Sequence, residues 1–480
     1  MLFSVFSSVE RTLIMKVSIA LAAVYALILF VAASVQHFLL GTGVWDIGLF
    51  VQFSWLIGEG KINAISSLRD ISPLQDHFSL LLLPLGLIYR FFPSPFSLIG
   101  LQSIALGCMP AVAGWIAWRR RICPELIWAL LIAIVLSPYP FLINRGDFHP
   151  DVLAVPLMLI AISDVQRTQR NRYYWCLLLT LFAKNAQALF GFGLGMYACA
   201  KGKYRRGLIT IIISLGWWFL ATALSSQGGD HVAIRMGYLG DTKLEMMLTL
   251  LTRPWVVFGV VSVEQVFLYT LGLCLPFLLL LRKAAWPALL GCLPVYLTNV
   301  VSASGIQREL DHHYSIAIFV FLIAACLDCM PDLSVKASRI HRRILYLTIL
   351  FSLVAFLGYA RIAYFQSRYW PRLAEAQEFF QVSNKIGGDE SVLTVSNYAV
   401  HLAGRELIEQ IEKNKFENYS DFDVVVLPGI KASTNDSSGR LRRVKDVKLG
   451  LLVSRVLVGA KSEGYKCDSN GGYVTICRKQ

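Results

Sequence analysis

VSIALAAVYALILFVAASVQ, residues 17–36, is the first of a series of long apolar runs along this chain. As an α-helix that rises about 1.5 Å per residue, a run of this length matches the roughly 30 Å hydrocarbon core of a bilayer. Lys16 directly precedes the run, and basic residues mark the cytoplasmic ends of membrane helices. The run therefore predicts a membrane anchor with a cytoplasmic N-terminus.

The composition as a whole is that of a polytopic membrane protein. Of 480 residues, 56% are hydrophobic and only 16% are charged, whereas soluble proteins average about 25% charged. The formal net charge of +14 would suit a nucleic acid, but the Lys and Arg residues stand in short clusters between apolar runs, as in cytoplasmic loops. We therefore expect membrane lipid around the protein and no nucleic-acid partner.

The basic clusters also predict the direction of each apolar run, and the predicted directions alternate along the chain. The predicted spans cover residues 17–36, 96–118, 126–143, 152–165, 175–183, 188–200, 208–224, 263–281, 287–301, 315–327 and 344–365. The apolar patch at residues 80–89 is too short to span and predicts a helix that lies in the membrane interface. The expected fold class is an all-α polytopic bundle of about 11 transmembrane helices, with interfacial helices in the first outer loop.

The chain becomes polar from residue 366, which divides it into a predicted transmembrane domain, residues 1–365, and a predicted small α/β domain, residues 366–480. A helix is expected at residues 371–386, with strands at 391–395 and 423–427. An odd number of crossings places this domain outside the cytoplasm. An oxidising compartment would permit a disulfide between Cys467 and Cys477, and two separate thiols fit the spacing equally well.

Ionisable and aromatic residues gather at the predicted outer ends of the apolar runs. Because charge in or beside hydrocarbon costs several kcal/mol, such residues indicate chemistry or transport. The assignment of sides used only the Lys and Arg flanks, so this convergence is a separate observation. The candidate site residues are Asp46, Asp76, His77, Asp147, His149, Asp151, Lys184, Arg308, His313 and Tyr314.

Asp46 follows the first predicted span and lies beside apolar residues that would keep it near the lipid surface. Partial desolvation would raise the pKa of its carboxyl group toward the working range of a general base, which could take a proton from an acceptor hydroxyl. The alternative is that Asp46 caps an interfacial helix, because Asp is favoured at that position.

Asp147, His149 and Asp151 lie within five residues of each other, and their oxygen and nitrogen atoms are acceptable ligands for a divalent cation. The alternatives are that Asp151 caps the helix that follows Pro150 and that Asp and His form a structural hydrogen-bonded pair. A divalent cation such as Mg or Mn is therefore a candidate cofactor at these three residues.

Lys184 lies in the middle of a long apolar stretch, where it must reach an interface or pair with an anion such as a lipid phosphate. Arg308 and His313 lie at the predicted outer end of a later apolar run, and two roles are open for them. They could contact phosphate, or they could anchor a loop in the interface.

Several short segments together resemble the DUF2079 family of predicted bacterial membrane proteins. They are WDIGLFVQ (45–52), DHF (76–78), PSP (93–95), DFHPDVLA (147–154) and HY (313–314). The resemblance extends through about residue 365. That family in turn resembles the GT-C superfamily of integral-membrane glycosyltransferases, which carry a catalytic acid in the first outer loop and take a sugar from a polyprenyl-phosphate donor.

The resemblance implies a protein of the bacterial plasma membrane with Asp46 as the general base. It also implies that Asp147 and His149 share the catalytic site, with Asp76, His77 and Asp151 near the donor or acceptor. The family often has Lys-Glu-Asp where this chain has Lys184-Asn185-Ala186. The loss of both acids argues against a metal or second-acid role there and leaves a phosphate contact for Lys184.

The implied reaction is a single inverting displacement at the anomeric carbon. Asp46 would deprotonate a glycan, lipid or protein acceptor, and the lipid phosphate would leave while cations such as Lys184 and Arg308 balance its charge. A lipid or small-molecule transporter, or flippase, is an alternative, although it would usually show internal repeats and helices broken at the midplane. A non-catalytic membrane assembly protein is the other alternative, and it would tolerate the loss of Asp46.

Overall fold

The structure is a computed structural model that describes residues 2–63, 65–146, 148–225, 230–331, 339–413, 419–429, 444–469 and 471–479. The chain divides into two compact units, each of which combines segments that are distant in the sequence. The first unit comprises Met1–Val31, Gln75–Leu81 and Gly100–Arg361. The second comprises Ala32–Leu74, Leu82–Ile99 and Ile362–Gln480.

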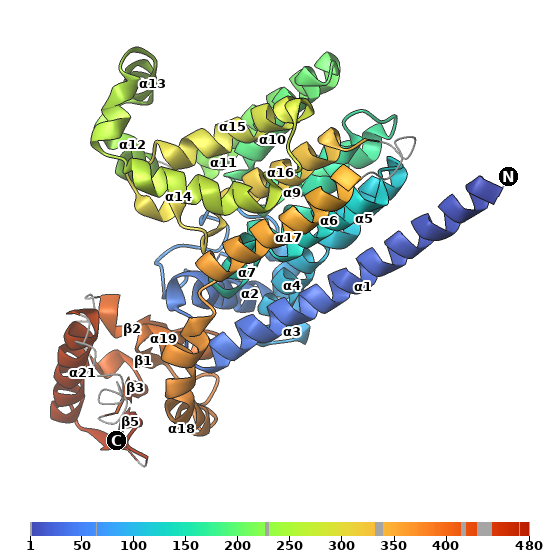
Figure 1. The fold of residues 1–480 in the computed structure, drawn as a ribbon. Helices are drawn as coiled ribbons and strands as arrows, with labels where there is room; N and C mark the ends of the chain where they lie inside the picture. The colour runs from blue at the N-terminus through green and yellow to red at the C-terminus, as the bar shows by residue number, and fades with distance from the viewer. Residues whose placement is uncertain are drawn as a thin grey trace. The chain divides into compact units, whose positions relative to one another are not determined.

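Helices form nearly all of the first unit (Figure 1). Helices α1 and α4 begin or end in the second unit, because the unit boundaries fall inside them. The α-helices are α1 (Leu2–Phe38), α4 (Pro95–Gly107), α5 (Met109–Arg119), α6 (Pro124–Val135), α7 (Pro138–Gly146), α8 (Val155–Asp164), α9 (Arg170–Ala183), α10 (Gln187–Ala200), α11 (Tyr204–Leu224), α12 (Asp230–Met236), α13 (Lys243–Thr252), α14 (Val263–Cys274), α15 (Trp286–Val300), α16 (Ile316–Cys329) and α17 (Arg339–Tyr359).

Five helical segments among the described residues are long and apolar enough to cross a membrane. They are Thr12–Phe38, Pro95–Arg119, Pro124–Gly146, Tyr204–Leu224 and Arg339–Tyr359, and each coincides with a predicted span. The other predicted spans correspond to shorter helices. In one of them, Pro276 lies in the short 3₁₀ turn that follows the end of α14. The all-α polytopic class is therefore confirmed, whereas the count of about 11 spans is not.

Close helix packing in the first unit depends on small residues. Helix α10 packs against α11 and α15, and α6 packs against α5 and α17. A Cβ atom built on Gly193 of α10 would lie 2.0 Å from the carbonyl oxygen of Gly291 in α15, so these backbones meet where neither residue has a side chain. Such contacts between small residues are typical of helix association in membranes. Lipid is as apolar as the helix surfaces, so the hydrophobic effect does not drive the helices together and close packing does.

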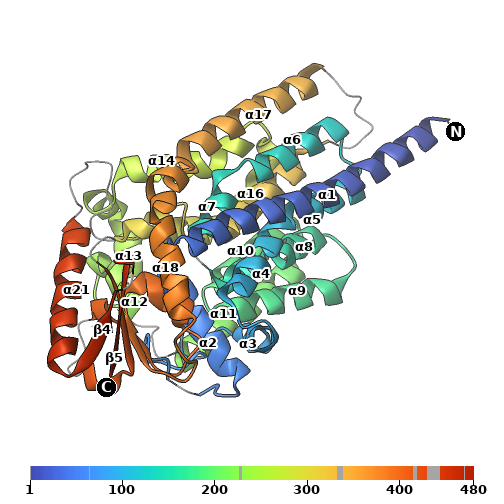
Figure 2. The same cartoon turned by 90° about the horizontal axis from the view of Figure 1, so that it is seen from below.

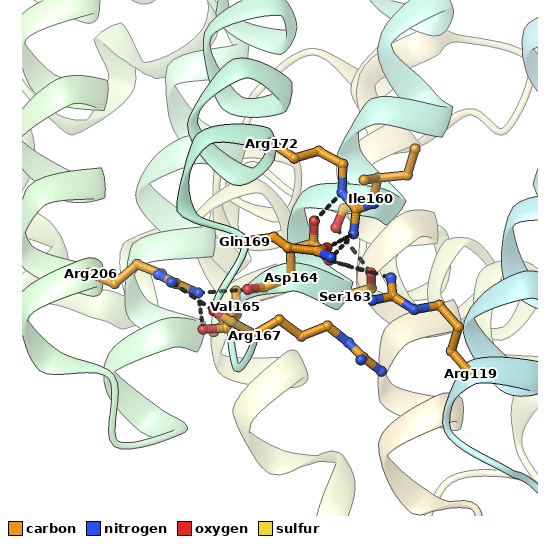
Figure 3. Close-up of polar contacts among 9 residues, drawn as sticks. All are labelled: Arg119, Ile160, Ser163, Asp164, Val165, Arg167, Gln169, Arg172 and Arg206. Atoms are coloured by element: carbon orange, nitrogen blue, oxygen red, sulfur yellow. Dashed lines mark hydrogen bonds and ion pairs between the residues drawn. The ribbon is translucent and has the colours of Figure 1, made fainter.

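A partly buried polar network around Asp164 joins α8, α9 and α11 (Figure 3). Asp164 at the end of α8 is fully buried, and its two carboxylate oxygens accept hydrogen bonds from the Arg172 guanidinium at 2.6 and 2.7 Å. Arg119 approaches the same carboxylate at 3.8 Å. Arg206 donates to the backbone carbonyl oxygen of Asp164 at 2.6 Å and to that of Arg167 at 2.9 Å. The network therefore fixes the connection between α8 and α9.

The second unit contains a five-stranded sheet in the order β2-β1-β3-β5-β4. Strands β1 (Val392–Thr394), β2 (Ile408–Gln410) and β3 (Val424–Pro428) are parallel, while β5 (Val474–Lys479) pairs antiparallel with β3 and with β4 (Tyr465–Asp468). Helix α21 (Val444–Ser462) covers one face of the sheet, with α18 (Leu373–Ser383) on the other side and α19 (Ser396–Leu402) following β1 (Figure 2). The expected small α/β sheet is present, and Cys467 and Cys477, opposite each other on β4 and β5, form a disulfide.

Most residues of the predicted first outer loop, apart from Gln75–Leu81, belong to this same unit. They form the π-helix η1 (Val44–Gly48), α2 (Leu49–Gly58) and α3 (Leu82–Phe91). The Ser67 hydroxyl donates to the carbonyl oxygen of Ile408 at 2.8 Å and accepts from its N–H at 3.0 Å, so it pairs with the backbone of the edge strand β2. The buried Gln52 amide donates to the carbonyl oxygen of Arg405 at 3.2 Å. The predicted boundary between domains at residue 365 stays a prediction.

Candidate functional site

His149, Asp151 and His313 form a buried cluster in the first unit. One ligand atom from each residue lies within 4.8 Å of the others, and the two imidazole ring centres are 3.8 Å apart. His149 and Asp151 lie where the chain enters α8, and His313 lies where it enters α16. The structure thus brings two neighbouring predicted site residues, His149 and Asp151, together with a third, His313, from a distant part of the sequence.

The backbone explains why these two entry segments meet. A Cβ atom built on Gly146 would lie 2.2 Å from the carbonyl oxygen of Asp311, so only glycine permits this approach. Two glutamines then hold the first segment. The side chain of Gln102 in α4 accepts the His149 backbone N–H at 2.9 Å, and the Gln187 amide in α10 approaches an Asp151 carboxylate oxygen at 3.5 Å.

Lys184 adds a positive charge to the cluster. It lies in extended backbone between α9 and α10, and only 6% of the residue is exposed. Its Nζ lies 3.0 Å from Nε2 of His313. Burial, followed by the charges of Lys184 and His312, lowers the pKa of His149 well below its ordinary value. The His149 imidazole is therefore neutral near pH 7 and can donate a lone pair to a cation.

Asp76 and His77 reach the same region through the backbone. The His77 carbonyl oxygen accepts the N–H of Asn185 at 2.9 Å, and the hydroxyl of Ser79 donates to the carbonyl oxygen of Ala183 at 2.7 Å. His77 has a left-handed backbone, with φ of 55°, and its Nε2 lies 3.6 Å from a carboxylate oxygen of the buried Asp76. The segment Gln75–Leu81 therefore lies beside the Lys184 connection.

Arg308 and Tyr314 are held by other contacts. The Arg308 guanidinium is buried and donates to the carbonyl oxygens of Asn299 at 3.0 Å and Ser302 at 2.6 Å. It therefore closes the C-terminal end of α15, where carbonyl groups lack helical partners. The Tyr314 hydroxyl accepts from Arg235 at 3.3 Å. The predicted phosphate contact of Arg308 stays a prediction.

A second, more exposed group consists of Glu309, Asp311 and His312. Arg361 pairs with the Asp311 carboxylate at 2.6 Å. Partial burial opposes ionisation of Asp311, but the hydrogen bond with His312 and the charge of Arg361 outweigh it and lower the pKa of this carboxyl group. Asp311 is therefore a stable anion that already has Arg361 as a cationic partner.

Asp46 belongs to the second unit, on the π-helix η1 that precedes α2. It is partly buried. The Ser396 hydroxyl accepts the N–H of Val44 at 3.1 Å and so holds the start of η1. π-Helical turns are rare and are frequent at functional sites. That Asp46 shares a site with His149 and Asp151 stays a prediction, and Asp147 lies outside the described residues.

The sequence interpretation did not single out Gln102, Gln187 or Asp164. Gln102 and Gln187 are polar residues in apolar helices, and a lone polar residue in an apolar run could have marked them as candidate site residues. Asp164 is an acid at the end of a predicted span next to a basic cluster, and the topology argument counted only the basic residues.

The apolar helices and the helical fold are those of an integral membrane protein. Residues 36–448 match the family DUF2079, described as a predicted membrane protein, and the chain belongs to that family. No protein of curated function matches the sequence.

A crystal structure of ArnT from Cupriavidus metallidurans bound to undecaprenyl phosphate is similar, with a TM-score of 0.53 and 12% identity over 96% of this chain and 97% of that chain. The structure of the same protein in the apo state gives a TM-score of 0.48 and 11% identity over 95% of this chain and 98% of that chain. At this level of identity, the likeness to the lipid-bound structure shows the fold.

Proposed function

We propose that the chain is an integral-membrane glycosyltransferase that transfers a sugar from a polyprenyl-phosphate donor to an extracytoplasmic acceptor with inversion. The observation that carries the proposal is the likeness over 96% of the chain to ArnT, a structure that holds undecaprenyl phosphate. The buried cluster with a lysine and two histidines supports it, because catalysis needs charged groups beside the departing phosphate.

In this proposal Asp46 is the general base that removes the proton of the acceptor hydroxyl. The oxygen then attacks the anomeric carbon, and the bond to the lipid phosphate breaks with its electron pair on the phosphate. Lys184 stabilises the charge that develops on the phosphate, and Asp147, His149 and Asp151 line the same site with Asp76 and His77. Arg308, His313 and Tyr314 border it.

The proposed topology places about 11 crossings in the bacterial plasma membrane, with the N-terminus cytoplasmic and the C-terminal residues outside. The disulfide between Cys467 and Cys477 supports an extracytoplasmic location, because disulfides persist in oxidising compartments. The outer residues 366–480 would then lie on the side of the acceptor, where they could contact a glycan, lipid or protein.

Replacing Lys184 with Met tests the proposed phosphate contact. Removal of one preorganised charge from a developing anion should lower kcat about 10²–10³-fold. The measurement is the rate of polyprenyl-phosphate release by purified protein in nanodiscs. Lys61→Met, which removes a part-exposed lysine paired with Glu406 in the second unit, is the matched control. Equal rates for wild type and Lys184→Met would contradict the assignment.

Ser396→Ala tests whether the C-terminal residues position Asp46. Loss of the hydroxyl that accepts the Val44 N–H should loosen η1 and lower kcat about tenfold, because catalysis is sensitive to small misplacements. The KM for the lipid donor should change little, and Ser396→Thr, which restores a hydroxyl, should recover most of the rate. A loss of activity that Ser396→Thr does not recover would argue against positioning through this hydrogen bond.

A further inference from the structure

The cluster of His149, Asp151 and His313 has a donor set that sugar transfer by Asp46 does not require. All three residues are buried, and one ligand atom from each lies within 4.8 Å of the others. Nδ1 of His313 is a buried nitrogen with no hydrogen-bond partner among the described residues. A buried polar atom of this kind costs free energy unless something binds it.

The chemistry of the donors indicates which ion would fit. Two imidazole nitrogens and one carboxylate oxygen are typical of zinc and of similar transition-metal ions. Magnesium prefers an all-oxygen octahedron and retains water, so it suits this set poorly. Three protein ligands also leave a fourth coordination position open, as in catalytic rather than structural zinc sites.

Surrounding residues would orient these ligands. The Gln187 amide lies 3.5 Å from Oδ2 of Asp151, and Gln102 fixes the backbone of His149 through a 2.9 Å hydrogen bond. Such supporting contacts commonly set the direction of metal ligands.

We propose that His149, Asp151 and His313 bind a zinc-type divalent ion whose occupancy is opposed by Lys184. Nδ1 of His313 is the ligand atom, and a bound ion requires the ring proton to be on Nε2 instead. The Lys184 ammonium, whose Nζ lies 3.0 Å from Nε2, cannot donate to a protonated nitrogen, so it must withdraw when the ion binds. When both histidines are neutral, the negative charge of Asp151 and the positive charge of Lys184 cancel. The site with its divalent ion bound then has a net charge of +2. An oxygen anion in the open position would offset this charge and attract Lys184 away from the ion. That part of the inference rests on the proposed function, which brings such an anion as the lipid phosphate.

The test is Co²⁺ binding to purified protein in detergent, after removal of any affinity tag and of bound metal by a chelator. Co²⁺ reports low-coordinate nitrogen and oxygen ligands through its visible absorption, and Zn²⁺ should displace it at one equivalent. His313→Ala and Asp151→Asn should weaken binding about 100-fold. His312→Ala, in the more exposed group with Glu309 and Asp311, is the matched control and should bind as the wild type does.

Lys184→Met supplies a result that misfolding cannot imitate. Removing the buried positive charge should tighten Co²⁺ binding about tenfold, because the charge repels the ion. A damaged fold would instead weaken Co²⁺ binding. Inorganic phosphate should tighten binding to the wild type and have less effect on Lys184→Met.

Three outcomes would overturn the proposal. They are no Co²⁺ or Zn²⁺ binding by the folded wild type, equal losses in His312→Ala and His313→Ala, and weaker binding in Lys184→Met. Because the assay measures metal and not sugar transfer, its failure leaves the proposed glycosyltransferase activity standing. Absence of transfer by a metal-loaded protein would instead count against the proposed function alone.

Discussion

Asp46→Asn is expected to lower sugar transfer about 10²–10⁴-fold, the usual contribution of a general base. The amide keeps the size of the side chain but cannot take the acceptor proton. Cells in which Asp46→Asn replaces the wild type at equal protein level should lose the glycan or glycolipid that the enzyme makes. The measurement is a mass-spectrometric comparison of envelope glycans and glycolipids.

Glu59→Gln is the matched control, because it removes an exposed carboxylate just after α2 in the same outer segment. It should leave the glycan profile unchanged. An unchanged profile in Asp46→Asn cells that contain folded protein would remove Asp46 from the mechanism and would favour a transporter or an assembly protein.

Asp164→Asn should destabilise the protein by about 1–3 kcal/mol, because it weakens charge-assisted hydrogen bonds to a buried carboxylate, while the part-exposed Arg172 can still reach water. Asp164 is fully buried and accepts both hydrogen bonds of the Arg172 fork, and Arg119 lies beside it (Figure 3). The measurement is the free energy of unfolding in mixed micelles, by titration with a denaturing detergent.

The control for this stability prediction is Glu264→Gln, which changes an exposed acid in the first turn of α14. Its effect should be below about 1 kcal/mol, because an exposed charge near a helix N-terminus contributes little. If Asp164→Asn unfolds as the wild type does, the network is not a source of stability.

The long apolar runs made the helical fold predictable. Residues 17–36 and 208–224 coincide with helices that can cross a membrane alone, since their length and hydropathy suffice. Shorter runs are ambiguous, because a buried helix of 14 residues such as α10 and a membrane span have the same apolar composition. The expected number of spans could therefore not be fixed by periodicity.

Other features could not be predicted from the sequence because they depend on tertiary contacts. Strand β2 has three residues, one of them Glu409, and gains its place from parallel pairing with β1 and from Ser67. The candidate site was partly predictable, because charged residues beside apolar runs are costly and conspicuous. That Lys184 would lie 3.0 Å from His313, which is 129 residues away, depends on how helices pack and could not be derived from spacing.

The most direct test of the central claim uses no knowledge of the sugar. Purified protein in nanodiscs is incubated with lipid and envelope extracts of its own cells, and free polyprenyl phosphate is measured by mass spectrometry over time. Wild type should release polyprenyl phosphate as acceptor is consumed, and Asp46→Asn should not. Folded wild-type protein that releases none, or an Asp46→Asn variant that releases it at the wild-type rate, would contradict the account.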